Sequence, residues 1–525
     1  MSWKTDFNRF QTGQIILSAG LYSLSFPPSP FGFLIYIALI PQINLYRTAG
    51  VKKGFLYGYS IGLIINALVL YWIIPYSLSS YLWMILANAL PFAIFGCIFS
   101  FISEKNSLVA LISFPFVWTF IEYIRQIGDL AFNWLSIAYT QSSFLSLIQY
   151  AEITGYLGIV FWICMINLLG FMVWKNWSNI RIRVYSLIII VVLFILPLIF
   201  GYNRLSEKEE TLGLAIGYVQ PNINPWLKWK ASYRYKNLEK LTQLTNRLLN
   251  TESQLVVWPE TALPFPLIQN RNIRESISKY ISDRGIHLIT GALDSGMVHS
   301  TSYKYNVAVH FAPGRGAQNM YRKLSLVPFV ERIPYQDIFT SLLGFDINDR
   351  FLSAGDSTTV FNILIKPYQL QFDGSDWSVV KKISDKRLVR FSSIICFESM
   401  FPNLVRKFFV KGAELLIIIT NDGWFGYSAQ PFQHARLAVF RAIEQRSSVI
   451  QCANNGVSVF IDPYGRMFYC SKIFTTGCTQ KIMPLKLRRT FYERYGDILG
   501  ILCSIVCFAL VLWCVYYYRT QGVVH

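Results

Sequence analysis

The sequence predicts a polytopic α-helical membrane domain of about eight transmembrane helices joined to an α/β domain. Of the 525 residues, 53% are hydrophobic and 15% are charged, whereas soluble domains carry roughly 25% charged residues. Apolar runs long enough to cross a bilayer recur in the N-terminal part of the chain. The hydrophilic stretch that follows alternates short β-type runs with helical patterns, which is typical of an α/β domain.

The apolar runs place the domain boundaries. We predict spans at approximately 13–26, 31–46, 54–76, 81–103, 107–123, 155–174, 184–202 and 498–518. The first two are short and are separated by the sequence PPSP, which indicates a tight reversal. The predicted domains are a membrane domain of seven transmembrane helices over 1–204, a hydrophilic domain over 205–494, and a final transmembrane helix with its tail over 495–525.

The net charge is +19, and many of the lysines and arginines flank the predicted spans. The connections that share one side of the membrane with the N-terminus carry Lys4, Arg9, Arg47, Lys52, Lys53, Lys105, Lys175, Arg181, Arg183 and Arg519. The connections PPSP and SLSS and the stretch 126–149, on the other side, carry none. Because positive charge favours the cytoplasmic side, we expect residues 205–494 outside the cytoplasm. The basic charge therefore does not predict a nucleic-acid partner.

Three polar motifs lie at strand ends of the hydrophilic domain. Glu260 follows a run of β-branched residues that ends in a strand-stopping proline. Lys323 precedes Glu331 in YRKLSLVPFVERIP, and Cys396 precedes Glu398 in IICFES. A carboxylate can take a thiol proton as a general base, and an ammonium group can favour the thiolate and hold an oxyanion. The set predicts a nucleophilic cysteine, provided that the fold brings these side chains together.

Each of these residues also has a purely structural interpretation. A cysteine at the end of an apolar strand is more often core than nucleophile, and a single glutamate or lysine is more often a turn or surface residue. His434 begins a predicted helix and is interpreted as a capping or packing residue, while Cys470 and Cys478 form either a disulfide or two free thiols. No CxxC pair or Cys/His spacing predicts a metal site. A polar stretch over 366–386 predicts an inserted loop or hairpin.

The wording of the motifs resembles a known family. WPETALPF, YRKLSLVPFVERIP, IICFES and TNDGWFG are similar to the glutamate, lysine and cysteine motifs of the nitrilase, or carbon–nitrogen hydrolase, superfamily. Together with the spans and the segments VWTFIEYIR, FNWLSIAYTQ and TFYERYGD, almost the whole chain resembles the apolipoprotein N-acyltransferases, bacterial inner-membrane enzymes that complete lipoprotein maturation. The resemblance implies a nitrilase-like αββα sandwich for the hydrophilic domain and eight membrane spans.

The resemblance also implies roles for individual residues. Cys396 is expected to be the nucleophile, Glu260 the general base and Lys323 the stabiliser of the oxyanion. Supporting roles are expected for Glu331 and Glu398, and substrate-binding roles for Trp229, Phe397, Asn421, Trp424 and Phe425. Two positions depart from the family pattern: Val330 stands where glycine is usual before Glu331, and Phe397 stands where tyrosine is common after the nucleophile.

The activity implied is acyl transfer from a phospholipid, through a cysteine thioester, to the α-amino group of the N-terminal diacylglyceryl-cysteine of an apolipoprotein. The expected partners are the phospholipid donor, the apolipoprotein acceptor and the bilayer, with no cofactor, no metal and no nucleic acid. The expected location is the bacterial inner membrane, with the catalytic domain in the periplasm. Two alternatives stay open: a membrane-tethered amidase with water as the acceptor, and a scaffold or transporter without catalysis.

Overall fold

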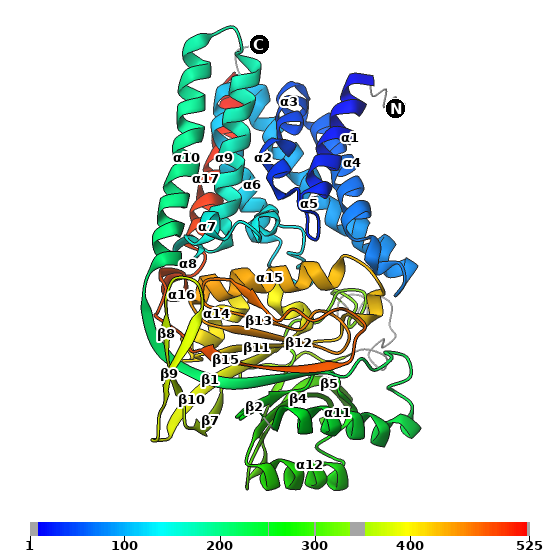
Figure 1. The fold of residues 1–525 in the computed structure, drawn as a ribbon. Helices are drawn as coiled ribbons and strands as arrows, with labels where there is room; N and C mark the ends of the chain where they lie inside the picture. The colour runs from blue at the N-terminus through cyan, green and yellow to red at the C-terminus, as the bar shows by residue number, and fades with distance from the viewer. Residues whose placement is uncertain (1–8, 250, 299–300, 336–351, 522–525) are drawn as a thin grey trace. The chain divides into compact units, whose positions relative to one another are not determined.

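The structure, a computed structural model, describes residues 9–249, 251–298, 301–335 and 352–521 (Figure 1). The chain forms two compact units. One consists of Met1–Gly201 together with Asp497–His525, and the other is Tyr202–Gly496. The helical unit is therefore discontinuous in sequence, since its last helix follows the second unit.

The first unit is helical. Its α-helices are α1 (Arg9–Leu24), α2 (Ile35–Ala38), α3 (Ile40–Thr48), α4 (Val51–Val69), α5 (Leu78–Lys105), α6 (Ser107–Ile124), α7 (Leu145–Ile148), α8 (Ala151–Thr154), α9 (Tyr156–Lys175), α10 (Ile180–Ser206), which continues into the second unit, and α17 (Ile498–Gln521). Among the described helices, five are long and apolar enough to cross a membrane, namely α5, α6, α9, α10 and α17.

The N-terminal spans differ from the predicted continuous helices. The run predicted at 31–46 is divided into η1 (Gly32–Leu34), α2 and α3. Pro41 lies in the first turn of α3, where its missing N–H costs nothing, so it starts a new helix instead of extending the previous one. Helix α1 has only 16 residues. The count of eight spans thus stays a prediction.

Glycines allow α4 and α5 to pack closely. A Cβ added at Gly58 would lie 2.2 Å from the Phe92 carbonyl oxygen, and one at Gly96 would lie 2.2 Å from the Gly54 carbonyl oxygen. Gly54, Gly58 and Gly62 are spaced by four residues, so they line one face of α4. Small residues at this spacing are typical of helix pairs inside membranes.

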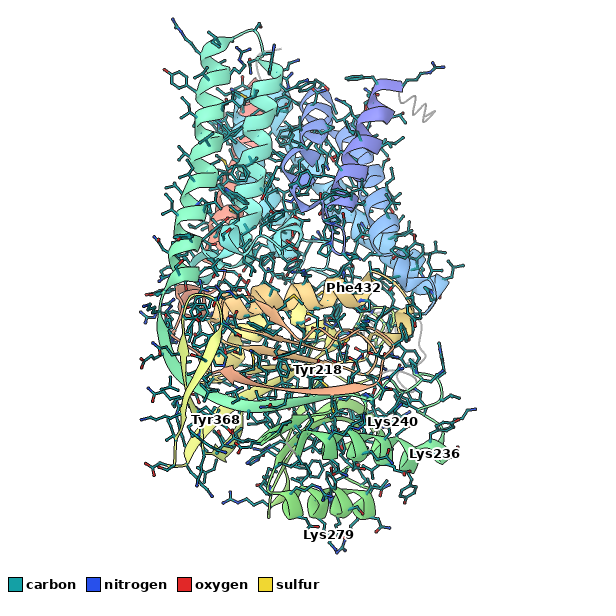
Figure 2. All side chains as sticks on the ribbon, viewed as in Figure 1. Tyr218, Lys236, Lys240, Lys279, Tyr368 and Phe432 are labelled. Atoms are coloured by element: carbon teal, nitrogen blue, oxygen red, sulfur yellow. The ribbon has the colours of Figure 1, made fainter. Side chains whose placement is uncertain are left out.

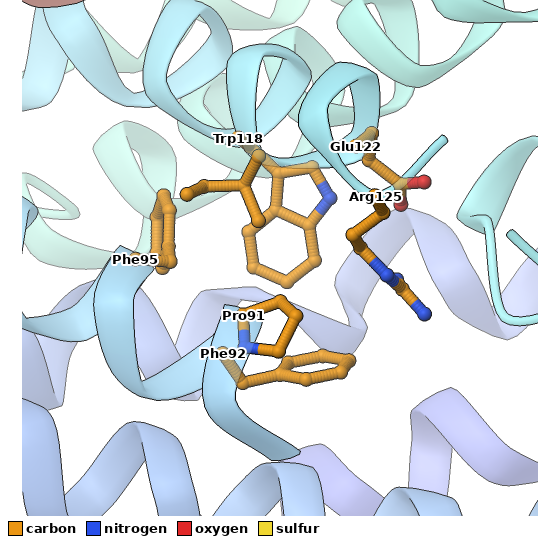
Figure 3. Close-up of a pocket in the computed structure, with 7 residues that line it drawn as sticks. Pro91, Phe92, Phe95, Trp118, Glu122 and Arg125 are labelled. Atoms are coloured by element: carbon orange, nitrogen blue, oxygen red, sulfur yellow. The ribbon is translucent and has the colours of Figure 1, made fainter. Parts of the chain in front are cut away.

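The charged residues at the end of α6 line a small pocket with aromatic walls (Figure 3). Its lining is Pro91, Phe92, Phe95, Trp118, Ile121, Glu122 and Arg125. Glu122 accepts a hydrogen bond from the Ile137 N–H at 3.3 Å, and the Arg125 guanidinium lies 5.7 Å from the ring centre of Phe92. Glu122 thereby fastens the connection that follows α6 to the end of that helix.

The second unit contains two β-sheets. Within the described residues, its strands are β1 (Glu209–Gln220), β2 (Leu255–Val257), β3 (Leu263–Pro266), β4 (His287–Val298), β5 (Thr301–Ala312), β6 (Gly316–Arg322), β7 (Phe361–Ile365), β8 (Tyr368–Phe372), β9 (Trp377–Lys382), β10 (Arg387–Ile395), β11 (Leu416–Thr420), β12 (Val449–Ala453), β13 (Val459–Ile461), β14 (Met467–Phe468) and β15 (Gly477–Pro484). One sheet has the order β6-β5-β4-β2-β1-β8-β9, with β15 paired to β1 and β3 paired to β4. The other has the order β14-β13-β12-β11-β10-β7.

Helices cover the outer face of each sheet, which gives an αββα sandwich (Figure 1). Helices α11 (Arg234–Leu249) and α12 (Arg271–Arg284) lie on the first sheet, while α14 (Pro402–Val410) and α15 (Gln430–Gln445) lie on the second; the short α16 (Phe491–Tyr495) ends the unit. Lys236 and Lys279 project outward from α11 and α12 (Figure 2). The predicted combination of a helical membrane domain with a nitrilase-like sandwich is confirmed.

The parallel strands determine where polar residues gather. β10, β11 and β12 run parallel, as do β1, β2 and β4. The carboxyl ends of parallel strands meet at one edge of a sheet, where open α/β sheets bind ligands. Cys396 follows β10 directly, and Asn421 follows β11 directly. Glu260 lies three residues after β2.

Candidate active site

Glu260 is held in a tight turn beside β4. A Cβ added at Gly291 would lie 2.6 Å from the Cα of Glu260 and 2.5 Å from the Thr261 nitrogen, so the turn requires glycine at that point. The carboxylate is buried and its Oε1 accepts a hydrogen bond from Asn306 Nδ2 at 2.7 Å. Burial raises the pKa of Glu260 above its ordinary value, although the charge of Lys323 opposes the rise. A carboxylate with a raised pKa is suited to accept a proton.

Lys323 follows β6 and lies between two carboxylates. Its side chain is 1% exposed, and Nζ is 2.8 Å from Glu331 Oε1 and 3.7 Å from Glu260 Oε1. Burial lowers the pKa of Lys323, but the charges of Glu331 and Glu260 raise it by more than burial lowers it. The pKa of Lys323 is therefore above its ordinary value. Lys323 is therefore a fixed cation, as an oxyanion-stabilising role requires.

Glu331 is positioned by the turn that precedes it. Its Oε2 accepts a hydrogen bond from the Val327 N–H at 2.9 Å, while Oε1 holds Lys323. The residue with a left-handed backbone in this turn is Phe329, with φ of 60°, and Val330 is not left-handed. Valine in place of the usual glycine therefore does not strain the turn.

Cys396 lies at the end of β10 and begins the short 3-10 helix η6 (Cys396–Met400). Its φ is 52°, a left-handed conformation that is uncommon for a residue with a side chain. Burial and the charge of Glu260 raise the pKa of the thiol well above its ordinary value, and the charge of Lys323 lowers it. The resting group is thus a thiol that needs a base before it can act as a nucleophile.

Glu398 connects the Cys396 turn to the segment after Lys323. The carboxylate is buried and accepts four hydrogen bonds: from the Tyr321 hydroxyl at 2.6 Å, and from the N–H groups of Leu324, Ser325 and Ile395 at 2.7, 3.1 and 2.8 Å. Two of these donors directly follow Lys323, and one directly precedes Cys396. Glu398 therefore fixes the spacing between the two motifs.

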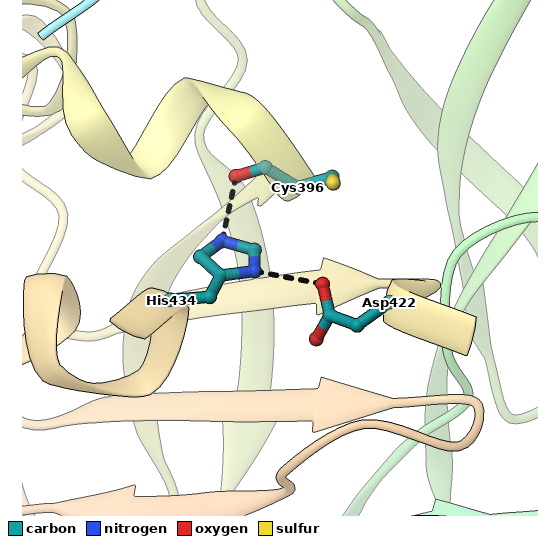
Figure 4. A group of neighbouring side chains, drawn as sticks. All are labelled: Cys396, Asp422 and His434. Atoms are coloured by element: carbon teal, nitrogen blue, oxygen red, sulfur yellow. Dashed lines mark hydrogen bonds and ion pairs between the residues drawn. The ribbon is translucent and has the colours of Figure 1, made fainter. Parts of the chain in front are cut away.

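His434 and Asp422 form a buried pair beneath Cys396 (Figure 4). His434 Nδ1 lies 2.9 Å from Asp422 Oδ1, and Nε2 lies 3.1 Å from the Cys396 carbonyl oxygen and 3.0 Å from Ser399 Oγ. The sequence interpretation of His434 as a capping or packing histidine did not include this contact. In the sequence His434 is only the fifth residue of α15, and the fold brings it to the Cys396 turn.

The thiol, one Asp422 oxygen and one His434 nitrogen lie within 4.8 Å of one another. These donor types are ones that Zn²⁺ accepts. However, Asp422 Oδ1 already accepts hydrogen bonds from Thr420, Gln430 and His434 at 2.8, 3.0 and 2.9 Å. The arrangement is accounted for by hydrogen bonds that support the Cys396 turn.

The predicted substrate-binding residues lie around these motifs. Phe397 is buried and its ring centre is 5.3 Å from that of Phe401. The indole of Trp424, in η7 (Asp422–Phe425), lies edge-on to the exposed Trp226 at 4.8 Å. Trp229 is exposed, and Phe425 is partly buried. Exposed indoles provide apolar contact area at the protein surface.

Lys228 was missed by sequence analysis. The side chain is buried and donates a hydrogen bond to Thr261 Oγ1. With the Asn421 amide turned to satisfy its neighbours, the amide oxygen accepts from Lys228 Nζ and from Trp424 Nε1, each at 2.9 Å. In the sequence NPWLKW, the one indication of burial is that Lys228 lies between apolar residues. The hydrogen-bond partners of Lys228 lie far away in sequence.

The chain is similar to several known proteins. Residues 18–169 match the family profile described as apolipoprotein N-acyltransferase N-terminal domain, and residues 215–478 match the carbon–nitrogen hydrolase profile. An apolipoprotein N-acyltransferase of Chlorobaculum tepidum is 28% identical over 95% of both chains, and one of Geobacter metallireducens is 28% identical over 93% of this chain and 92% of its own. A nitrilase-superfamily crystal structure from Saccharomyces cerevisiae aligns with 53% of this chain and 92% of its own, with 17% identity and a TM-score of 0.38.

Proposed function

Because the chain belongs to the carbon–nitrogen hydrolase family, in its apolipoprotein N-acyltransferase branch, we propose that it transfers an acyl chain from a phospholipid to an apolipoprotein. The acceptor is the α-amino group of the N-terminal diacylglyceryl-cysteine. The observation that carries the proposal is the buried Glu260–Lys323–Glu331 cluster, in which the charges of Glu260 and Lys323 act on the Cys396 thiol. Together with Cys396, the cluster supplies a base, a fixed cation and a nucleophile.

The first half of the reaction forms a thioester. Glu260 takes the proton of the Cys396 thiol, and the sulfur attacks the carbonyl carbon of a phospholipid ester. Lys323 donates a hydrogen bond to the oxyanion of the tetrahedral intermediate. When the intermediate collapses, the bond to the glycerol oxygen breaks, that oxygen takes the proton from Glu260, and lysophospholipid leaves.

The second half transfers the acyl group to nitrogen. The neutral amine of the acceptor attacks the thioester carbon, and Glu260 takes its surplus proton. The carbon–sulfur bond then breaks, and the departing sulfur recovers the proton from Glu260. An α-amino group has a pKa near 8, so a fraction of the acceptor is neutral at physiological pH.

The location of the substrates favours a site at the membrane surface. Each buried CH₂ of an acyl chain contributes about 0.8 kcal/mol to membrane affinity, so extracting a whole chain into water is costly. Trp226, Trp229 and Trp424 supply apolar contact area near the cluster. The lysine and arginine distribution supports a periplasmic position for the catalytic domain, with the helical unit in the bacterial inner membrane.

Intact-mass analysis tests the proposal. The purified chain, mixed with phospholipid vesicles, is expected to gain the mass of one acyl chain, and Cys396→Ser is expected to gain none. Addition of a diacylated lipopeptide should then move the acyl group to the peptide amine. Release of the chain as free fatty acid instead would favour a membrane-tethered amidase, and an adduct on both proteins or on neither would contradict the proposed mechanism.

A further inference from the structure

Lys228 is a buried lysine that the mechanism above does not use. It lies in the turn after β1, and its Nζ contacts three different parts of the site. The Thr261 hydroxyl accepts its hydrogen bond on one side, and the Asn421 amide oxygen accepts at 2.9 Å on another. The ammonium group also lies 5.4 Å from the ring centre of Trp229. Few lysines are fully buried unless they are paired, so these contacts need an explanation.

The contact with Thr261 supports the catalytic base. Thr261 directly follows Glu260 and has a φ of 45°, a left-handed conformation that is strained for a β-branched residue. Such a conformation persists only where the surrounding structure fixes it. The hydrogen bond from Lys228 is one such restraint, and it acts on the residue adjacent to the base.

The contact with Asn421 connects Lys228 to the pair of tryptophans Trp424 and Trp226. The same amide oxygen that accepts from Lys228 accepts from Trp424 Nε1 at 2.9 Å, and Trp424 packs on Trp226. The ammonium group therefore joins the turn of Glu260 and Thr261 to the loop that carries Trp424.

Charge adds to this geometry. Among the described residues, Glu260 is the group whose charge acts on Lys228, and Lys228 in turn lowers the pKa of Glu260, alongside Lys323, while Glu331 raises it. Burial lowers the pKa of Lys228 to about 7. Lys228 thus gains and loses its proton close to neutral pH, whereas Lys323 stays charged.

We propose that Lys228, in its charged form, is a positioning residue of the acyl-transfer site that holds the Glu260 turn against the Asn421–Trp424 loop. It also keeps Glu260 ionised so that the carboxylate can take the thiol proton. The proposal rests on the proposed function for its biological meaning. Its test uses a reaction that needs the Cys396 thiolate but no lipid. The result therefore decides the role of Lys228 even if the acyl-transfer proposal fails.

The test measures the rate at which iodoacetamide alkylates Cys396, followed on the Cys396 peptide by mass spectrometry, from about pH 6 to about pH 8.5 around the pKa of Lys228. At the low end, Lys228→Met is expected to react about tenfold more slowly than the wild type, because a lost neighbouring cation shifts a carboxyl pKa by one unit or more. At the high end the two rates should converge, since the wild-type lysine has then lost its charge. Lys228→Arg should match the wild type at low pH and exceed it at high pH.

Lys230→Met is the matched control, because Lys230 is exposed in the same turn; its rates should equal those of the wild type throughout. If Lys228 has a purely structural role, its replacement slows alkylation of Cys396 by the same factor at every pH. A constant ratio for either Lys228 variant, or a Lys228→Met rate within about twofold of the wild type at low pH, would overturn the proposal. If Lys228→Met does not fold, the ratio of Lys228→Arg to wild type decides alone.

Discussion

Left-handed backbones mark the turns that carry the proposed catalytic groups. Thr261, Phe329 and Cys396 have φ values of 45°, 60° and 52°. Thr261 directly follows Glu260, and Phe329 lies two residues before Glu331. Each such conformation costs about 1–3 kcal/mol and survives only in a tightly restrained site. At Cys396 the restraint comes from Glu398, whose carboxylate accepts hydrogen bonds from the N–H groups of Ile395, Leu324 and Ser325.

Glu398→Gln tests this restraint at the residue scale. The carboxylate now accepts hydrogen bonds from N–H and O–H groups. The NH₂ group of the new amide is itself a donor and cannot accept those hydrogen bonds. We expect a loss of about 1–3 kcal/mol in the free energy of unfolding, and a fall in Cys396 acylation on the order of 100-fold from misplacement of the nucleophile. Denaturant unfolding and intact-mass kinetics measure the two effects. Glu239→Gln, on the exposed face of α11, should change neither; equal acylation by the two variants would contradict the role given to Glu398.

How far the sequence predicted the site depends on where each residue's partners lie. The types and order of Glu260, Lys323 and Cys396 were readable from motifs, because each follows a recognisable strand end. Lys228 and the Asp422–His434 pair could not be predicted in this way. Lys228 contacts Thr261, which is 33 residues away in sequence. His434 contacts the Cys396 carbonyl, which is 38 residues away. A motif reports the local chain, whereas a positioning contact is created by the fold.

At the scale of elements, strand ends were predicted better than helix continuity. The polar stretch 366–386 forms the β8–β9 hairpin, one of the two structures that the sequence allowed. The apolar run 31–46 suggested one span, but the run contains Pro41, which divides it into short helices. Hydrophobicity alone does not distinguish a continuous helix from a broken one that is equally buried.

Gly291→Ala tests the fit between β4 and the Glu260 turn. The added Cβ would lie 2.5–2.6 Å from Thr261 N, Glu260 Cα and the Pro259 oxygen, all of them backbone atoms. We expect a loss of about 1–3 kcal/mol from overpacking and slower acylation, because Glu260 must move. Gly296→Ala is the control in the same strand, since among the described residues no atom lies within 4 Å of its added Cβ. Acylation of Gly291→Ala at the rate of Gly296→Ala would show that the base tolerates the shift.

At the scale of the whole catalytic domain, two histidines lie between the sheets. His287 on β4 and His310 on β5 stack with ring centres 5.4 Å apart, and their nitrogens are 3.2 Å apart. The His310 ring also lies 5.8 Å from Phe361 and 5.6 Å from Phe391, both on the second sheet. Burial lowers the pKa of His287 to about 4 and that of His310 to about 3.

These values make the stability of the domain depend on pH. An unfolded histidine has a pKa of about 6.5, so above that pH both states are neutral and the pair contributes no pH dependence. Between about pH 6.5 and the folded pKa values of about 4 and about 3, the unfolded chain binds protons that the folded chain does not. The free energy of unfolding should therefore fall with falling pH, by up to about 2.7 kcal/mol per pH unit for two groups.

Denaturant unfolding of the full chain in detergent, at neutral pH and at about pH 5, measures this effect. His310→Phe removes one of the two titrating groups and keeps a ring against Phe361 and Phe391, so its stability should decrease less than that of the wild type over the same interval. The same pH slope in His310→Phe as in the wild type would mean that other groups govern the acid sensitivity, and that the ring pair contributes packing without a penalty for protonation.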